Sequence, residues 1–298
     1  MDEIDRRIIR RLQWPNSDTE FSFSDFAVSR STGVSVQTVR KRIARMVENG
    51  ILKGNYLMPM PSLFGLSSGT LVCSYSKEVA ERPWDYLNAV PALSSVHTAQ
   101  TPPMAIMEVM PRIGEEKATV REVESLGVRV ESQLWHYHEP VQLSRRECLV
   151  LSRLMENHRM SLRELSERTG ISTKSVSRIM RGLISRNCFT IEVAIDSRAV
   201  DHGTLFILQA TVMPGRASQV ITRVASKLGD RMMGFRYLSD DTILFLAWAE
   251  NTMRVMEAGR FVESMREVAL SITVRDFQTT VRYPDTLMEA LKGVAEKN

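Results

Sequence analysis

The sequence predicts an α+β protein in which two winged helix-turn-helix units alternate with two ferredoxin-like βαββαβ units. A helical stretch around a glycine turn occurs twice, 137 residues apart, and each copy precedes a segment that mixes strands with helices. The 298 residues are 43% hydrophobic and 25% charged, as in ordinary globular proteins. We expect the winged units to cover residues 1–62 and 141–200, and the sheet units, which are RAM-like, to cover 63–140 and 201–298.

Three helices open each copy. Apolar spacing predicts them over residues 2–13, 24–31, 35–48, 144–157, 161–168 and 172–185. Serines stand at expected N-cap positions, namely Ser24, Ser35, Ser161 and Ser172. Gly33 and Gly170 supply the left-handed conformation that ends the second helix just before the third begins. Helix, short glycine turn and helix together form the helix-turn-helix pattern.

Extended segments follow each set of helices. Residues 51–60 and 188–196 are predicted as wings. The later predicted strands cover residues 70–76, 95–100, 104–110, 128–138, 204–212, 232–238, 242–250 and 271–281. Helices are predicted between them over residues 83–90, 115–126, 217–228 and 253–268. The order βαββαβ in both copies implies a ferredoxin-like sandwich.

Cysteine usage and hydropathy indicate a cytoplasmic protein. The three cysteines lack CxxC spacing, which argues against a disulfide framework. The longest dense apolar run, residues 242–249, is too short to span a bilayer. Residues 1–12 are charged throughout and contain no secretion signal. We therefore expect no membrane partner.

Positive charge gathers in the two helical units. Residues 1–60 carry three more basic than acidic residues, and residues 141–200 carry five more. Residues 61–140 are net acidic, and residues 201–298 are neutral. A basic patch on an otherwise neutral chain is typical of proteins that bind nucleic acids.

The third helix of each copy has one apolar and one basic face. The apolar residues are Val39, Ile43, Met46 and Val47 in the first copy, and Val176, Met180, Leu183 and Ile184 in the second. The opposite faces hold Gln37, Lys41, Ala44 and Arg45, and Lys174, Arg178, Arg181 and Gly182. No carboxylate occurs among these eight outer positions. The pattern predicts that both helices enter the major groove of DNA.

Double-stranded DNA is the partner that these faces suit. Lysine and arginine neutralise phosphates, and arginine or glutamine can pair with purine edges. Arg40 and Ser177 lie beside the apolar stripe and would reach phosphates at most, while Lys53 is near the first wing. The predicted DNA-contacting residues are Ser35, Gln37, Thr38, Arg40, Lys41, Arg45, Lys53, Thr173, Lys174, Ser175, Ser177, Arg178 and Arg181.

The first copy carries several motifs in a fixed order. They are Asp2 and Asp5 in the first helix, the pair Arg42–Ile43 in the third, the turn "ENGIL" at 48–52, and Phe64–Gly65–Leu66 after the wing. In this order they resemble the Lrp/AsnC family of prokaryotic transcription regulators. The resemblance covers nearly the whole chain, once per copy, and implies a winged helix followed by an effector and oligomerisation domain. Copy one is the closer match and copy two is eroded, which leaves open whether copy two still binds DNA.

The chain departs from that family in two ways. Family members usually hold one copy and dimerise, whereas this chain holds a tandem duplication that would form an intramolecular pseudo-dimer; a further homodimer is left open. Family effector sites use a Gly-x-x-Asp-like turn between the second and third strands. The first copy has Pro102 and Pro103 there, so any small-molecule effector, such as an amino acid, is assigned to Asp240 and Asp241 of the second copy.

We expect a sequence-specific DNA-binding transcription regulator that is not an enzyme and has no cofactor, metal or catalytic residue. The chain also resembles the siroheme decarboxylases, which share this architecture and use histidines in the second domain. The corresponding region here holds His97 without the further histidines that such chemistry would need. His136 and His138 share one face of a strand, but no third ligand lies at metal-binding spacing. A siroheme-decarboxylase-like enzyme, or a metabolite-sensing or assembly scaffold that binds no DNA, remain the alternatives.

Overall fold

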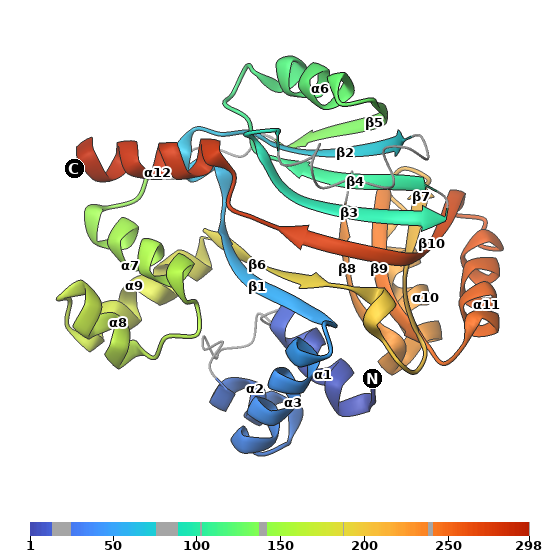
Figure 1. The fold of residues 1–298 in the computed structure, drawn as a ribbon, viewed down its shortest axis with the longest axis horizontal. Coiled ribbons are helices and arrows are strands. Elements are labelled where there is room, and N and C mark those ends of the chain that lie inside the picture. Colours follow the sequence, from blue (N-terminus) through green and yellow to red (C-terminus); the bar gives the residue numbers. More distant parts are fainter. Residues whose placement is uncertain are drawn as a thin grey trace.

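The computed structural model describes residues 1–13, 25–75, 89–101, 103–136, 142–186, 188–237 and 241–297. It confirms the α+β class, with two helix-turn-helix units that alternate with two ferredoxin-like units (Figure 1). The helical units lie on one side of the molecule, and the strands of the two ferredoxin-like units join into one eight-stranded sheet. None of the helices in these ranges is both long and apolar enough to cross a membrane.

The six predicted helices of the winged units are confirmed with small shifts at their ends. They are α1 (Glu3–Gln13), α2 (Asp25–Thr32), α3 (Val36–Glu48), α7 (Arg145–Glu156), α8 (Leu162–Thr169) and α9 (Thr173–Ser185). Ser35, Ser161 and Ser172 each cap a helix with the side chain, whereas Ser24 lies outside the described residues. Gly33 and Gly170 have φ angles of 73° and 67°, so each turn uses the left-handed conformation that glycine adopts without strain.

The large sheet has the strand order β5-β2-β4-β3-β10-β7-β9-β8. Its strands are β2 (Ser68–Tyr75), β3 (Leu93–Thr101), β4 (Pro103–Val109), β5 (Val128–His136), β7 (Thr204–Val212), β8 (Met232–Tyr237), β9 (Thr242–Ala249) and β10 (Val268–Val281). Within each half the order is fourth, first, third and second strand, as in a ferredoxin-like sandwich. The halves join where β3 pairs antiparallel with β10, from Ser95 opposite Val281 to Thr101 opposite Arg275.

Helices cover one face of each half-sheet. They are α6 (Glu116–Ser125), α10 (Ala217–Leu228) and α11 (Thr252–Glu263), and all three were predicted. Of the predicted helix over residues 83–90, residues 83–88 lie outside the described residues, and residues 89 and 90 are not helical. Beneath α10 and α11 a separate core forms around Phe206 and Phe245, which are almost fully buried.

The two predicted wings are not independent hairpins. Strands β1 (Leu52–Pro59) and β6 (Phe189–Ile195) pair with each other, antiparallel, in a two-stranded sheet that joins the halves (Figure 1). Tyr56 lies opposite Glu192, and Leu57 lies opposite Ile191. Both strands are too apolar to remain exposed edges, and each supplies hydrogen-bond partners for the backbone N–H and C=O groups of the other.

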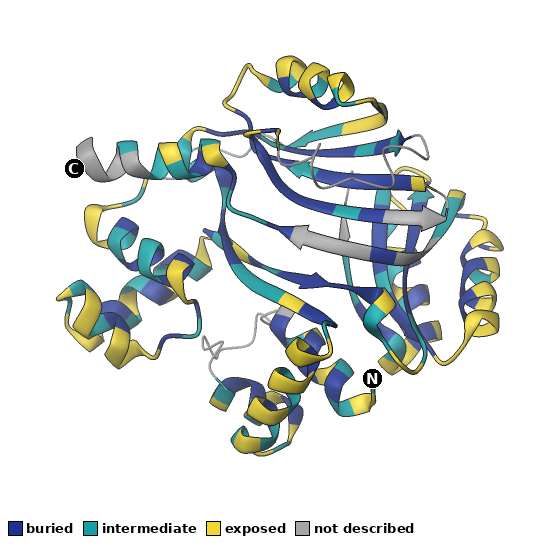
Figure 2. Ribbon diagram, in the orientation of Figure 1, coloured by how far each residue is buried: buried dark blue, intermediate teal, exposed yellow. Residues whose placement is uncertain are grey.

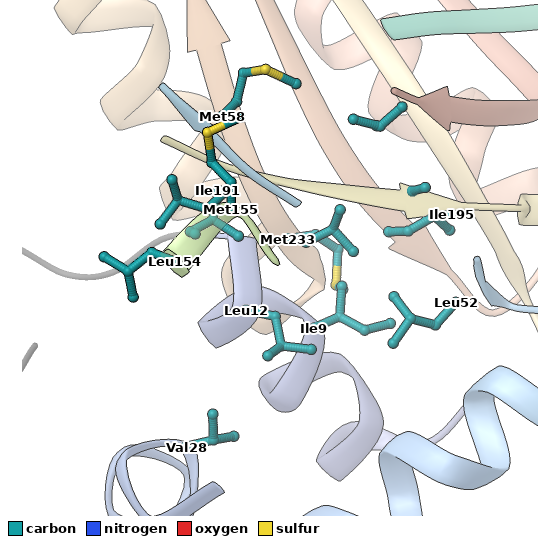
Figure 3. Close-up of a cluster of buried hydrophobic side chains, with 14 of the residues drawn as sticks. Ile9, Leu12, Val28, Leu52, Met58, Leu154, Met155, Ile191, Ile195 and Met233 are labelled. Carbon is teal, nitrogen blue, oxygen red and sulfur yellow. The ribbon is translucent and has the colours of Figure 1, made fainter. Parts of the chain in front are cut away.

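One continuous core connects the winged units to the sheets. Ile9 and Leu12 of α1 pack toward Met233 of β8, and Met155 of α7 packs toward β1 and β6 (Figure 3). The residues on the inner faces of the helices and on the sheet are mostly buried, while those on the outer faces of the helices are mostly exposed (Figure 2). The winged units are therefore fixed to the sheet by apolar packing rather than tethered by linkers.

A C-terminal helix, α12 (Asp285–Lys297), was not predicted. It is fastened by the Asp285 amide, which donates to the Pro91 carbonyl at 2.9 Å, and by the Thr286 hydroxyl, which donates to the Met110 carbonyl at 2.7 Å. Leu287 is fully buried. Just before α12, the Tyr283 hydroxyl donates to the Met155 carbonyl at 2.8 Å, so this segment holds the second winged unit against the first half-sheet.

Candidate nucleic-acid interface

Helix α3 presents its outer face to solvent. The Ser35 hydroxyl accepts a hydrogen bond from the Thr38 amide at 3.1 Å and lies 2.8 Å from the Thr38 hydroxyl. Val39 and Met46 are buried as predicted. Val47 is 53% exposed, so its assignment to the apolar stripe was wrong: no described element covers that side of the last turn.

Three of the predicted outer-face residues of α3 are open to a ligand. Gln37, Lys41 and Ala44 are exposed, and neither Gln37 nor Lys41 forms a hydrogen bond or ion pair with any residue that the structure describes. The hydroxyls of Ser35 and Thr38 are engaged with each other in the cap. Gln37 and Lys41 are therefore the side chains of α3 best placed to meet a base edge or a phosphate.

Arg45 has a structural partner that the sequence did not reveal. Its Nη2 lies 2.7 Å from Oδ2 of Asp5, which is 1% exposed, and Arg42 Nη1 lies 3.3 Å from the other carboxylate oxygen. Arg42 also pairs with Asp2. Burial raises the pKa of Asp2, but hydrogen bonds from the Asp5 amide and Arg42 outweigh it and lower that pKa overall. This network, which we call the Asp5 network, ties α3 to α1, so Arg45 belongs to the fold.

Arg40 and Lys53 are also engaged. Arg40 Nε donates to Asp25 at 2.6 Å, and Arg159 of the second winged unit binds the same carboxylate. The Lys53 ammonium folds back over Gly50, and its charge helps Arg198 lower the pKa of Asp196. Both side chains therefore support the junction between the halves.

Helix α9 exposes more unpaired charge than α3. Lys174, Arg178 and Arg181 are exposed and form no ion pair within the described ranges. Thr173 is exposed, and Ser177 is half-buried. The Ser175 hydroxyl accepts a hydrogen bond from the Ser172 hydroxyl at 3.1 Å in the cap, so it is engaged within the helix start, unlike the three cations.

An ion pair fixes the end of α9 much as the Asp5 network fixes α3. Glu147 of α7 binds Arg186 and the Ser144 amide. Burial raises the pKa of Glu147, but the hydrogen bonds from Ser144 and the charge of Arg186 lower it further than burial raises it. The C-terminal end of α9 is thereby held to the start of α7.

Sequence reasoning missed Arg145 and Arg146 at the start of α7. Both are exposed, and they line a hollow of about 520 Å³ with Ser172 and Ser175 in front of α9. No carboxylate occurs among the lining residues of this hollow. The sequence contained a signal for these two residues. Cations in the first turn of a helix interact unfavourably with the helix dipole, so a pair of them there indicates a functional role.

The predicted effector and histidine positions do not assemble a site with the described residues. Asp240 and His138 lie outside them. Asp241 is exposed; its carbonyl accepts from the Val212 amide at 2.6 Å, and its carboxylate accepts from the Thr242 hydroxyl at 3.2 Å. His97 lies in β3 and His136 at the end of β5. No group of three metal-ligating side chains occurs in this part of the chain, and an effector role for Asp241 stays a prediction.

A family model described as "Winged helix-turn-helix DNA-binding" matches residues 143–187. This range contains α7, α8 and α9, so the match falls in the copy that we expected to be the more eroded. No curated protein matches the chain.

Two solved structures of one protein share the fold over the whole chain. The siroheme decarboxylase NirDL is 13% identical, with 99% of each chain covered and a TM-score of 0.56. Its complex with an iron-uroporphyrin III analogue gives 14% identity, 99% of this chain, 98% of that chain and a TM-score of 0.54. AsnC of E. coli is 11% identical over 48% of this chain and 95% of its own, with a TM-score of 0.33.

These comparisons correct one expectation. We expected the chain not to be an enzyme, and the full-length likeness to a siroheme decarboxylase overturns that exclusion. At 13% identity the likeness shows the architecture alone. The chain therefore shares the fold of NirDL from end to end, and residues 143–187 match a family model of winged helix-turn-helix domains.

Proposed function

We propose that the protein is a sequence-specific DNA-binding transcription regulator of the Lrp/AsnC type, which reads DNA with α3 and α9. The observation that supports this most is the unpaired positive charge on two exposed helix faces, Lys41 on the first and Lys174, Arg178 and Arg181 on the second. Cations on an exposed helix usually alternate with carboxylates, and these faces have none. Phosphates would supply the missing counter-charge.

The proposed contacts are of two kinds: side chains that contact base edges, which we call readers, and side chains that contact phosphates. Gln37 and Lys41, and Lys174 and Arg178, lie in the first half of their helices, where a recognition helix meets base edges. Arg145 and Arg146, beside the start of α9, suit phosphates. Because the two reader pairs differ, we expect an asymmetric operator with half-sites about 34 Å apart.

A duplicated module in one chain accounts for this arrangement. The same strand order in both halves supports it, as does the pairing of β1 with β6, which occupy matching places in the two copies. The proposed units are those expected above, 1–62, 63–140, 141–200 and 201–298. A DNA partner implies that the protein works in the cytoplasm.

The test is selection of bound DNA from a random pool, followed by salt titration of the selected sequence. Lys41→Ala and Arg178→Ala should each weaken binding and lower the slope of log affinity against log salt by about 0.9 per lost phosphate contact. Lys117→Ala, an exposed lysine on α6, is the matched control and should leave the slope unchanged. Failure to enrich any sequence, or an equal loss in the control, would overturn the proposal.

A second candidate is a tetrapyrrole-modifying enzyme. The likeness to NirDL over 99% of both chains favours it, and one NirDL structure holds an iron-uroporphyrin III analogue. Titration with iron-uroporphyrin III should then shift the Soret band saturably, and His97→Gln should abolish the shift. An unchanged spectrum at saturating tetrapyrrole would set this candidate aside.

A further inference from the structure

The two winged units differ in how their cations are paired. In the second unit, Arg181 on the outer face of α9 and Arg145 and Arg146 at the start of α7 are exposed, and they form no ion pair with a residue that the structure describes. The hollow that Arg145 and Arg146 line contains no carboxylate that would compete for them. All three side chains are therefore available to neutralise phosphates.

The arginines that flank the outer face of α3 are engaged by carboxylates. On one side Arg40 Nε lies 2.6 Å from Oδ2 of Asp25, and on the other Arg45 Nη2 lies 2.7 Å from Oδ2 of Asp5. A paired arginine offers little attraction to a phosphate, because its carboxylate would approach the same phosphate and repel it. Within the described ranges, neither flank of α3 therefore offers an unpaired arginine to DNA.

The first helices of the two units begin with opposite charges. Glu3 and Asp5 occupy the first turn of α1, whereas two arginines begin α7. Arg10 of α1 is exposed and has no ion-pair partner in the described chain, but it lines a hollow against β8 rather than the outer face of α3. Lys41 is thus the unpaired cation that α3 itself presents to a ligand.

Asp25 holds Arg40 at a junction between the two winged units. Arg159, in the turn between α7 and α8, binds the same carboxylate as Arg40. The side chains of Asp25 and Arg159 are 20% and 28% exposed, whereas that of Arg40 is 70% exposed. Arg159 is therefore fixed inside the junction, and Arg40 would turn to solvent if the carboxylate were removed. Because Arg40 follows Gln37 by three residues, its guanidinium would then lie beside the outer face of α3.

We propose that the second winged unit makes the phosphate contacts that hold DNA, that the first contributes base contacts through Gln37 and Lys41, and that Asp25 maintains this division by holding Arg40. The inference rests on the proposed function, because it concerns how the same partner is bound. Phosphate contacts carry no sequence information, so the second unit supplies the affinity that is independent of sequence. This assigns the larger share of DNA affinity to the copy that the sequence left in doubt.

The first test compares two arginines. Arg181→Ala and Arg40→Ala each remove an exposed arginine from a third helix, and the affinity of the full chain for a duplex of random sequence is measured by fluorescence anisotropy over a range of salt concentrations. Arg181→Ala should lower the slope of log affinity against log salt by about 0.9. Arg40→Ala should leave the slope unchanged, because Asp25 already neutralises that charge.

The second test releases Arg40. Asp25→Asn should raise the salt slope by about 0.9 and tighten binding of the random duplex about fivefold near physiological salt. Adding Arg40→Ala to Asp25→Asn should abolish that gain. Glu257→Gln is the matched control, because it releases Arg254 from an ion pair of 2.7 Å on α11, and it should change neither quantity.

Urea denaturation gives the folded fraction of each variant, by which every affinity is corrected. The comparison of Arg181→Ala with Arg40→Ala needs no change at Asp25, so it decides the matter even where Asp25→Asn unfolds. Equal slope changes for the two arginines, no gain in Asp25→Asn, or a gain that persists without Arg40 would each overturn this inference and leave the proposed function standing. Failure of the parent chain to bind any duplex would refute the proposed function, and this inference with it.

Discussion

Lys41 and Arg45 occupy the same exposed face of α3, one turn apart, yet we expect their removal to have opposite consequences. Arg45 Nη2 contacts Asp5, whose side chain is 2% exposed, and Arg45 itself is 48% exposed. Arg45→Ala leaves that carboxylate with Arg42 at 3.3 Å and the Asp2 amide at 3.2 Å. Lys41 has no such partner among the described residues.

The magnitude follows from these contacts. A hydrogen bond from a charged donor to a buried carboxylate contributes about 1.5–3 kcal/mol. Half-exposure of Arg45 and the remaining partners of Asp5 reduce this, so Arg45→Ala should lower the free energy of unfolding by about 1–2 kcal/mol. Lys41→Ala should change it by less than about 0.5 kcal/mol.

Urea denaturation, followed by circular dichroism, measures both variants. DNA affinity, corrected for the folded fraction, should fall for Lys41→Ala and change little for Arg45→Ala. Equal stability of the two variants would refute the assignment of Arg45 to the Asp5 network. A larger loss of DNA affinity in Arg45→Ala than in Lys41→Ala would show that the arginine leaves Asp5 to meet the nucleic acid.

Val39→Ala should lower the free energy of unfolding by about 1–3 kcal/mol, because Val39 is fully buried, and should leave the affinity of the folded fraction unchanged in a DNA titration. Replacing Arg145 and Arg146 together by alanine should reduce the salt slope of DNA binding by about 1.8, equally for selected and random sequences; a sequence-dependent loss would make them base readers. Burial lowers the pKa of His158 to about 4, below its ordinary 6.5, so the folded state resists its protonation. Between about pH 6.5 and pH 4 only the unfolded state binds this proton, so the free energy of unfolding falls as pH drops through that range, by up to about 3 kcal/mol. The denaturation midpoint of His158→Gln should not show this decline.

Local sequence signals predicted most of the helices and strands. Serine caps and glycine turns act within a few residues, so Ser35, Gly33 and Gly170 mark helix ends whatever surrounds them. The same reasoning failed for Val47, because helical periodicity defines an apolar face and does not reveal how far the neighbouring helices extend along it. Helix α12 was missed because its anchors, such as the Met110 carbonyl, are distant in the chain.

Part of the candidate interface could also be predicted from the sequence, and part could not. The sequence placed Gln37, Lys41 and Arg178 on outer faces, and all three are exposed. It could not separate Lys41 from Arg45, because both are cations at equivalent spacing and only the position of Asp5 in space distinguishes them. Nor could it predict that Arg6 stacks on Trp248, since these residues are brought together by packing of α1 on the second half-sheet.

By itself the sequence determined the order of the elements, the caps and turns that bound the helices, and the side of each third helix that faces outward. These depend on backbone preferences and on the spacing of apolar side chains within one element. Only the tertiary structure decided that β1 and β6 form one sheet, that β3 joins β10, and which arginines are engaged in ion pairs. Those features depend on pairing between residues far apart in the chain, and a periodic pattern carries no information about which partner an edge strand or a charged side chain will meet.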